Sequence, residues 1–195
     1  MSTESVWTTR GFEDFSRGVC GNAGQNLYVS RAGVLQRIHQ FDLNRDGYPE
    51  LIFCNSQNHW EKPPAYVYSD VFNQPQRLEL PSDGALAGAV ADFNGDGYAD
   101  LVLAMQYNGA TFDTNAFVYY GAPDGWSERR MTQLPAPACT AVAAGDFNGD
   151  GRPDLAFLCR GKVRLFYQTR LGLEPKRYVE LDIAGEQLAA EDLDG

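Results

Sequence analysis

The sequence predicts an all-β fold built from repeated, four-stranded antiparallel sheets. An acidic motif occurs three times, as FDLNRDGYPELIF, ADFNGDGYADLVL and GDFNGDGRPDLAF, with its first aspartate at residues 42, 92 and 146. A second marker, a tyrosine followed five residues later by glycine, occurs at 28–33, 120–125 and 167–172. The apolar runs are short and bounded by Gly, Pro, Asn and Asp, which favours strands over helices. Four short strands in each unit of about 50 residues are typical of the blades of a β-propeller.

The second repeat shows the expected order of strands within a blade. LAGAVADF leads into the acidic loop, ADLVLAM leaves it, AFVYYG follows, and SERRMTQLP supplies the fourth strand. The strands that leave the loops, such as LVLAM and LAFLC, do not alternate between apolar and polar residues. We therefore expect them to be buried on both faces.

The repeats divide the chain into five segments. We expect an irregular N-terminal segment with a partial blade at 1–33, blades at 34–81, 82–135 and 136–183, and the start of a fourth repeat at 184–195. Closed propellers contain about four to eight blades. We therefore expect a partial propeller of about four blades, a fragment of a larger one, whose exposed sheet edges favour self-association.

Composition and charge exclude several classes of protein. Apolar residues make up 44% of the 195 residues, which is a globular composition. The net charge of −10 argues against a nucleic-acid partner. No apolar run approaches the about 18 residues of a membrane span, and no signal peptide is visible. Eleven of the 26 acidic residues lie in the repeated motif or its C-terminal remnant, so the acidity belongs to that motif.

The four cysteines do not form a metal-binding pattern. None lies in a C-x-x-C pair, and the chain has only two histidines, so a zinc site is not expected. Cys139 and Cys159 flank the third acidic loop on strands expected to be neighbours, which permits a disulfide. Buried free thiols are the favoured interpretation.

Each acidic loop has the pattern D-x-N-x-D-G-x-x-[D/E], which predicts a calcium site. Calcium prefers six or more oxygen ligands, and alternate residues of a tight loop direct their oxygens to one centre. Glycine at position 6 permits the sharp turn, and the carbonyl at position 7 adds a ligand. An EF-hand needs a glutamate at position 12 and flanking helices, whereas here position 12 is apolar and lies in a strand. Magnesium is disfavoured because it rarely occupies all-protein cages. The expected ligands of the three Ca²⁺ ions are Asp42, Asn44, Asp46, the Tyr48 carbonyl and Glu50; Asp92, Asn94, Asp96, the Tyr98 carbonyl and Asp100; and Asp146, Asn148, Asp150, the Arg152 carbonyl and Asp154.

Together these motifs resemble the FG-GAP or VCBS repeat family, whose calcium-bearing blades occur in integrin α-subunit propellers and many bacterial surface proteins. The resemblance covers about residues 26–195 and includes the segment YYGAPDG. It implies a propeller with calcium loops between the first and second strands of each blade. It does not imply one activity, because members include adhesins, glycan-binding modules and accessory domains of enzymes. Glu50 departs from the usual aspartate at position 9, which implies a looser or bidentate first site.

The loops between the second and third strands differ among the repeats, so they are candidates for ligand binding. In the first repeat this loop offers amides, a carboxylate and a flat aromatic ring, which suit a sugar. The candidate ligand-binding residues are Asn55, Asn58, His59, Trp60 and Glu61. Packing of Trp60 against a neighbouring blade is the competing and slightly favoured interpretation of that residue.

Two functions are compatible with the sequence. The first is a non-enzymatic, calcium-stabilised propeller that binds a glycan or protein at the cell surface. The second is part of an extracellular polysaccharide-degrading enzyme, lyase-like, whose catalytic groups lie elsewhere. The chain has no serine or cysteine nucleophile motif and no phosphate-binding loop, so no catalytic residue is assigned. Calcium sites of extracellular modules are filled only at high calcium concentration, which favours a location outside the cell.

Overall fold

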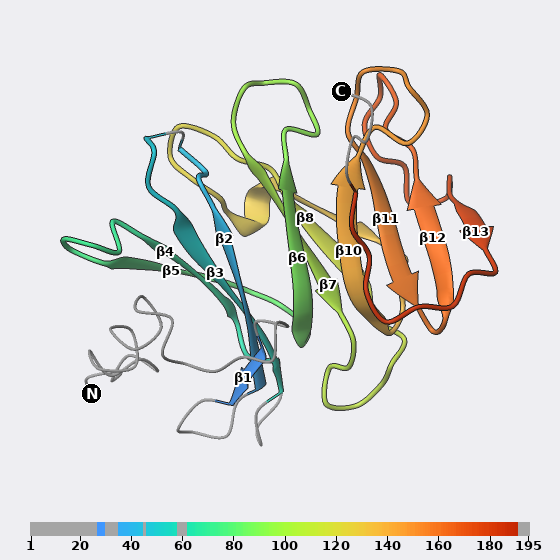
Figure 1. The fold of residues 1–195 in the computed structure, drawn as a ribbon, viewed down its shortest axis with the longest axis horizontal. Helices are drawn as coiled ribbons and strands as arrows, with labels where there is room; N and C mark the ends of the chain where they lie inside the picture. Colours follow the sequence, from blue (N-terminus) through green and yellow to red (C-terminus); the bar gives the residue numbers. More distant parts are fainter. Residues whose placement is uncertain (1–26, 30–34, 45, 58–61, 191–195) are drawn as a thin grey trace.

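A computed structural model describes residues 27–29, 35–44, 46–57 and 62–190. These residues form three antiparallel sheets that lie in a row, and in the described part of the chain the row does not close into a ring (Figure 1). The prediction of an all-β fold made of four-stranded blades is confirmed. A single short helical turn, η1 (Glu128–Arg130), interrupts the strands among the described residues.

Each sheet is a meander in which consecutive strands are neighbours. The first sheet has a short extra strand, β1, that pairs with β2 in antiparallel register. The first sheet contains β1 (Leu27–Val29), β2 (Leu35–Phe41), β3 (Glu50–Gln57), β4 (Ala65–Ser69) and β5 (Gln76–Leu80). The second contains β6 (Ala85–Ala91), β7 (Asp100–Met105), β8 (Ala116–Tyr119) and β9 (Met131–Leu134). The third contains β10 (Cys139–Gly145), β11 (Asp154–Cys159), β12 (Lys162–Phe166) and β13 (Val179–Leu181).

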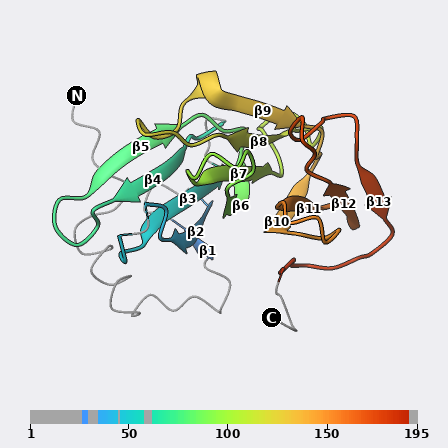
Figure 2. The same ribbon diagram turned by 90° about the horizontal axis from the view of Figure 1, so that it is seen from above.

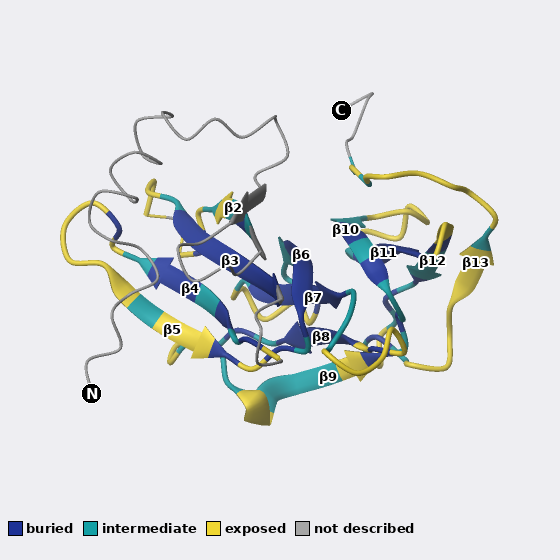
Figure 3. Cartoon of the chain, turned by 90° about the horizontal axis from the view of Figure 1, so that it is seen from below, coloured by how far each residue is buried: buried dark blue, intermediate teal, exposed yellow. Residues whose placement is uncertain are grey.

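The middle strands are buried on both faces because each sheet packs against the next. All six residues of β7 and all six of β11 are buried, as the sequence predicts. In β7 the side chains alternate between two cores. Leu101 and Leu103 join the core shared with the first sheet, and Val102 joins the core shared with the third. The outermost strands β5 and β13 are largely exposed (Figure 3).

The first full-length strands of the three sheets, β2, β6 and β10, lie close together. The Arg37 guanidinium on β2 donates a hydrogen bond to the Thr140 carbonyl on β10, at 3.0 Å. The Gly88 N–H on β6 donates to Nε2 of His39 on β2, at 3.1 Å. Seen from above, the sheets fan outward from this side (Figure 2). The outer strands of neighbouring sheets are therefore farther apart than the inner strands β2, β6 and β10.

Cys139 and Cys159 form a disulfide, so the expectation of free thiols was wrong for this pair. The two residues are directly opposite each other in the register of β10 and β11. Facing positions of an antiparallel pair bring side chains close enough to be bridged. Cys54 is a buried free cysteine, and Cys20 lies outside the described residues.

No helix in the described part of the chain has the length and apolarity that crossing a membrane requires.

Candidate metal centres in three repeated loops

The three acidic loops connect the same two strands of each blade. They join β2 to β3, β6 to β7 and β10 to β11, and all three lie at one edge of the molecule (Figure 1). The turns between β4 and β5, β8 and β9, and β12 and β13 line hollows together with the acidic loop of the same blade, so they lie at the same edge. The loops after β3, β7 and β11 lie at the opposite edge.

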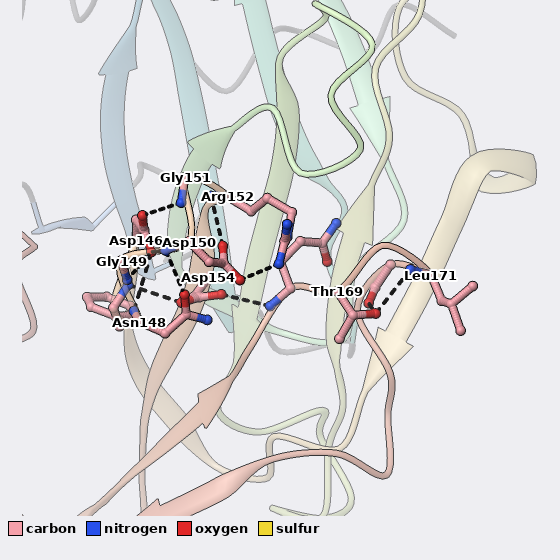
Figure 4. Close-up of polar contacts among 12 residues, drawn as sticks. Asp146, Asn148, Gly149, Asp150, Gly151, Arg152, Asp154, Thr169 and Leu171 are labelled. Carbon is pink, nitrogen blue, oxygen red and sulfur yellow. Dashed lines mark hydrogen bonds and ion pairs between the residues drawn. The ribbon is translucent and has the colours of Figure 1, made fainter.

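The carboxylate at position 1 organises each loop by accepting backbone N–H groups. In the third loop, Asp146 Oδ1 accepts from the N–H of Gly149 at 2.7 Å and of Asp150 at 3.1 Å (Figure 4). Its Oδ2 accepts from the N–H of Gly151 at 2.6 Å. These donors hold the pKa of Asp146 below its ordinary value, with the Gly151 bond as the largest cause. The carboxylate is therefore ionised and turned into the loop.

The oxygen atoms at positions 1 and 3 converge on one N–H in every loop. In the first loop, the Asp46 N–H donates both to Asp42 Oδ1 and to Asn44 Oδ1, each at 3.0 Å. The corresponding distances are 3.1 and 2.9 Å from the Asp96 N–H and 3.1 and 2.9 Å from the Asp150 N–H. Two sequence-predicted side chains of each loop, at positions 1 and 3, are thus brought together at the backbone of position 5.

Glycine at position 6 has the backbone conformation that the sequence predicts. Gly47, Gly97 and Gly151 have φ values of 87°, 89° and 81°. This left-handed region is strained for residues with a Cβ atom. The turn lets the next residue donate its N–H to the carboxylate at position 5, as Tyr98 does to Asp96 at 2.9 Å.

The carboxylate at position 9 is buried and ties the loop to the rest of its blade. Asp100 is fully buried and accepts from the N–H of Phe93 and of Gly121, both at 2.8 Å. Asp154 is also fully buried and accepts from the N–H of Phe147 at 3.0 Å and of Gln168 at 2.7 Å. These donors come from position 2 of the same loop and from the end of the third strand of the blade.

Glu50 makes a different set of contacts because its side chain is one carbon longer. It accepts from the N–H of Leu43 at 2.7 Å and from the Asn44 amide at 3.3 Å. Burial raises the pKa of Glu50 and of Asp154 above their ordinary values, and raises the pKa of Asp100 to about 6. The backbone donors oppose this shift, so buried carboxylates at position 9 are stabilised by the donors they bind.

The partners of position 9 were not predicted from the sequence. Gly121 and Gln168 each follow the tyrosine of the repeated Tyr–Gly marker. The sequence therefore showed the marker, but not that the residue after its tyrosine donates an N–H to position 9. A Cβ atom at Gly121 would lie 2.3 Å from the Ala99 carbonyl oxygen, so glycine permits this close approach. The close approach brings the Gly121 N–H to Asp100.

The donor set of each loop fits a hard cation by its chemistry, since it consists of carboxylate, amide and carbonyl oxygens. Within the described ranges, however, no three His, Cys, Asp or Glu side chains are gathered into a ready-made metal site. In these loops the carboxylates instead bind N–H groups. Carboxylate oxygens that accept a single N–H, such as Asp146 Oδ2, keep a second lone pair that is available to a cation.

The third loop differs from the other two at position 5. The Asn44 and Asn94 amides donate to Asp46 Oδ2 and Asp96 Oδ2, at 2.9 and 2.8 Å. In the third loop the guanidinium of Arg152 pairs with Asp150 Oδ2 instead. A charge of the protein itself thus neutralises one carboxylate of the third loop.

The predicted ligand-binding loop after β3 is only partly described. Asn55 is buried, and its amide donates to the Pro64 carbonyl at 2.5 Å, so this side chain helps to fix the loop. Asn58, His59, Trp60 and Glu61 lie outside the described residues. Whether they bind a ligand stays a prediction.

Comparison with known proteins identifies the repeat. A family model described as "FG-GAP-like repeat" matches residues 42–103 and, in a second copy, residues 92–157. The chain is 27% identical over 164 residues to a phosphatidylinositol-glycan-specific phospholipase D of Mus musculus, a match to 69% of this chain and 19% of the relative. It is 26% identical over 172 residues to a T-cell immunomodulatory protein homolog of Plasmodium falciparum, covering 78% of this chain and 22% of that protein. The chain thus spans about a fifth of the length of these relatives.

The family match covers more than half of the chain, from residue 42 to residue 157, and spans all three acidic loops and the strands between them. The chain therefore belongs to the FG-GAP-like repeat family.

Proposed function

We propose that this chain is a calcium-stabilised, non-catalytic β-propeller module that binds a glycan or a protein outside the cell. The observation that carries the proposal is the convergence of the oxygens at positions 1 and 3 on one N–H, in the same geometry in all three loops. Each loop also carries carboxylates at positions 1, 5 and 9, and a divalent cation would offset the repulsion among these like charges.

The calcium ligands in this proposal are the side chains at positions 1, 3, 5 and 9 and the carbonyl at position 7. When bound, the ion would neutralise the clustered charge and link the two strands that flank the loop. The protein's own contribution is to orient the oxygens through backbone N–H groups and to close the turn at Gly47, Gly97 and Gly151.

One observation and one consequence of the proposed calcium sites support a location outside the cell. The Cys139–Cys159 disulfide is the kind of bond that persists in oxidising compartments. Calcium sites of extracellular modules bind in the range of about 0.1–1 mM, which extracellular calcium fills. Membership of the FG-GAP-like family also favours an adhesion or binding role over a catalytic one.

A second candidate is an accessory part of a larger enzyme. The similarity to a phosphatidylinositol-glycan-specific phospholipase D, over 69% of this chain, favours it. Assays of the chain for lyase activity and for phosphodiester hydrolysis, with the mouse phospholipase D as a positive reference for the latter, test this candidate. Activity of the chain alone would contradict a non-catalytic module.

Thermal unfolding with and without calcium tests the proposed function. A site filled to 10–100 times its Kd stabilises the fold by about 1.4–2.7 kcal/mol, so three sites should raise Tm by on the order of 10 °C between EGTA and 10 mM calcium. Magnesium at the same concentration should give a much smaller shift, because it resists such cages.

The variant Asp46→Asn/Asp96→Asn/Asp150→Asn should lose the calcium shift while still folding in EGTA. The control Asp124→Asn, on an exposed turn, should keep it. An unchanged Tm of the unmodified chain on adding calcium would rule out structural calcium.

A further inference from the structure

A groove lies between the first and second sheets, at the same edge as the acidic loops. Its volume of about 760 Å³ is within the range of small-molecule sites. The first sheet contributes residues of β4, β5 and the first loop, and the second contributes residues of the second loop and of the β8–β9 connection. The sequence pointed instead to the loop after β3, at the opposite edge.

Two aromatic rings from the second sheet line this groove. Tyr98 follows the turn glycine of the second loop, and 42% of its surface is exposed. Trp126 is partly buried, and its indole N–H donates to the Ala99 carbonyl at 2.9 Å, which fixes the plane of the ring. Fixed, partly exposed rings bind ligands at little cost in conformational entropy.

The charged side chains that line the groove already have partners inside the protein. Arg77 forms an ion pair with Glu79 at 2.6 Å and lies over the Tyr66 ring, 4.8 Å from its centroid. Asp124 forms an ion pair with Arg130 at 2.9 Å. Glu50 is buried, and its oxygens accept hydrogen bonds from Leu43 and Asn44. The groove therefore offers aromatic rings and hydrogen-bonding groups, and its charged side chains do not require a charged ligand.

A second hollow lies between the second and third sheets. Its volume is about 650 Å³, and its lining includes Arg152, Arg170 and Asp92. Arg152 pairs with Asp150, so this hollow presents charges of both signs. Neutral and acidic ligands therefore have to be compared directly.

We propose that the groove between the first two sheets binds a neutral oligosaccharide. The apolar faces of the sugar rings stack on Tyr98 and Trp126, and hydroxyl groups exchange hydrogen bonds with Gln76 and Arg77 at the wall formed by β5. Sugars combine apolar ring faces with hydroxyls in this way, which matches the mixed lining of the groove. This inference rests on the proposed binding function and names its ligand class and its place.

Glycan binding by the full 195-residue chain in 10 mM calcium tests the proposal. The probe is an array carrying neutral oligosaccharides that end in glucose, galactose, mannose or N-acetylglucosamine, together with sialylated, sulfated and uronate-containing ones. We expect binding to neutral glycans. For the strongest neutral glycan, titration calorimetry gives the Kd of each variant.

Tyr98→Ala should weaken that binding by roughly tenfold, the upper range for loss of one stacked ring, and Tyr98→Phe should retain it because the ring remains. Trp126→Phe, which keeps a ring but loses the N–H that orients it, should also weaken binding. Phe72→Ala is the matched control, because Phe72 is an exposed aromatic at the same edge outside the groove. It should leave the Kd unchanged.

Three outcomes would overturn the proposal: no glycan is bound, only acidic glycans are bound, or Trp60→Ala abolishes binding while Tyr98→Ala does not. Melting curves of the same samples with EGTA and calcium separate this proposal from the proposed function. A calcium shift without glycan binding removes the groove proposal alone, whereas an absent calcium shift removes the calcium-stabilised module.

Discussion

In the second and third repeats, the position 9 carboxylate connects the acidic loop to the residues that follow the third strand of the blade. Asp100 and Asp154 reach two backbone N–H groups that are distant in sequence, and both side chains are fully buried. A short aspartate at the start of a buried strand can do this only if the third strand ends beside it. The contact therefore forms only when the third strand is in place, and it needs no bound ion.

Asp100→Asn should destabilise the fold even without calcium. The amide presents one acceptor where the carboxylate presented two, so a buried N–H of Phe93 or Gly121 loses its partner. Such a loss costs about 1–3 kcal/mol. Urea unfolding in EGTA measures it, with Asp124→Asn expected within about 0.5 kcal/mol of the unmodified chain. Equal stability of Asp100→Asn and the unmodified chain would contradict this role.

His39 is a second residue whose chemistry depends on its neighbours. Burial, with a smaller contribution from Arg37, lowers the pKa of His39 to about 4. Its Nε2 accepts the Gly88 N–H, so the folded protein holds a neutral imidazole between the first two sheets. Protonation at Nε2 would break this contact.

Stability should therefore fall as the pH falls from about 6.5 to about 4. In the unfolded chain the imidazole is protonated below about pH 6.5, whereas in the folded state it is protonated only below about pH 4. Between these values the proton binds to the unfolded chain alone, so acid lowers the free energy of unfolding by about 2–3 kcal/mol. His39→Gln keeps an acceptor but does not titrate. The difference in unfolding free energy between the two proteins isolates His39, because carboxylates contribute to both. Parallel pH profiles would exclude His39 as a source of the acid sensitivity.

The loop with its two flanking strands is the element that repeats, and the third copy is reinforced by a disulfide. Cys139 and Cys159 bridge β10 and β11 at a sequence separation of 20, and the stretch between them contains the third loop. The third loop is also where Arg152 pairs with Asp150. In the third repeat, the disulfide and the Arg152–Asp150 ion pair therefore stabilise the loop without a bound ion.

Cys139→Ala/Cys159→Ala should destabilise the chain by about 3 kcal/mol, the loop-closure value for a bridge of this span. Urea unfolding of the unmodified chain with reductant should reproduce this loss. Cys54→Ala controls for removal of a buried thiol. If reductant had no effect on unfolding, the bridge would not contribute to stability.

On the scale of the whole molecule, neighbouring sheets are joined by shared cores. Position 2 of each loop packs toward the following sheet: Leu43 belongs to the core between the first and second sheets, and Phe93 to the core between the second and third. Phe147 has the same position in the third loop but is 39% exposed. No further sheet follows the third in the described part of the chain.

Phe93→Ala should therefore cost about 3–5 kcal/mol, as for a phenylalanine removed from a core, whereas Phe147→Ala should cost less than about 1 kcal/mol. Urea unfolding with tryptophan fluorescence measures both. Similar losses for the two variants would contradict coupling of the blades through position 2.

The outer strands limit association of the sheets. β5 is largely exposed and carries the Arg77–Glu79 ion pair, and charges on edge strands disfavour pairing with another chain. The expected self-association through blade edges stays a prediction, although the charges on β5 oppose it there. Sedimentation at several concentrations tests it.

The sequence by itself determined the repeat, the class of strand and the loop chemistry. These follow from local patterns: the period near 50 residues, the short apolar runs, the glycine at position 6 and the alternating oxygens. A pattern that is local needs no knowledge of neighbours, so the all-β blades and the turn at Gly47, Gly97 and Gly151 could be predicted.

Only the tertiary structure decided which surfaces and pairs those elements form. Three features depend on residues from different strands or sheets. They are the bond between Cys139 and Cys159, the hydrogen bond from Gly121 to Asp100, and the groove beside Tyr98. Burial depends on which sheet packs against which face, so identical loop positions such as Phe93 and Phe147 have different surroundings. The sequence repeats the loop, but contacts between sheets give each copy its own role.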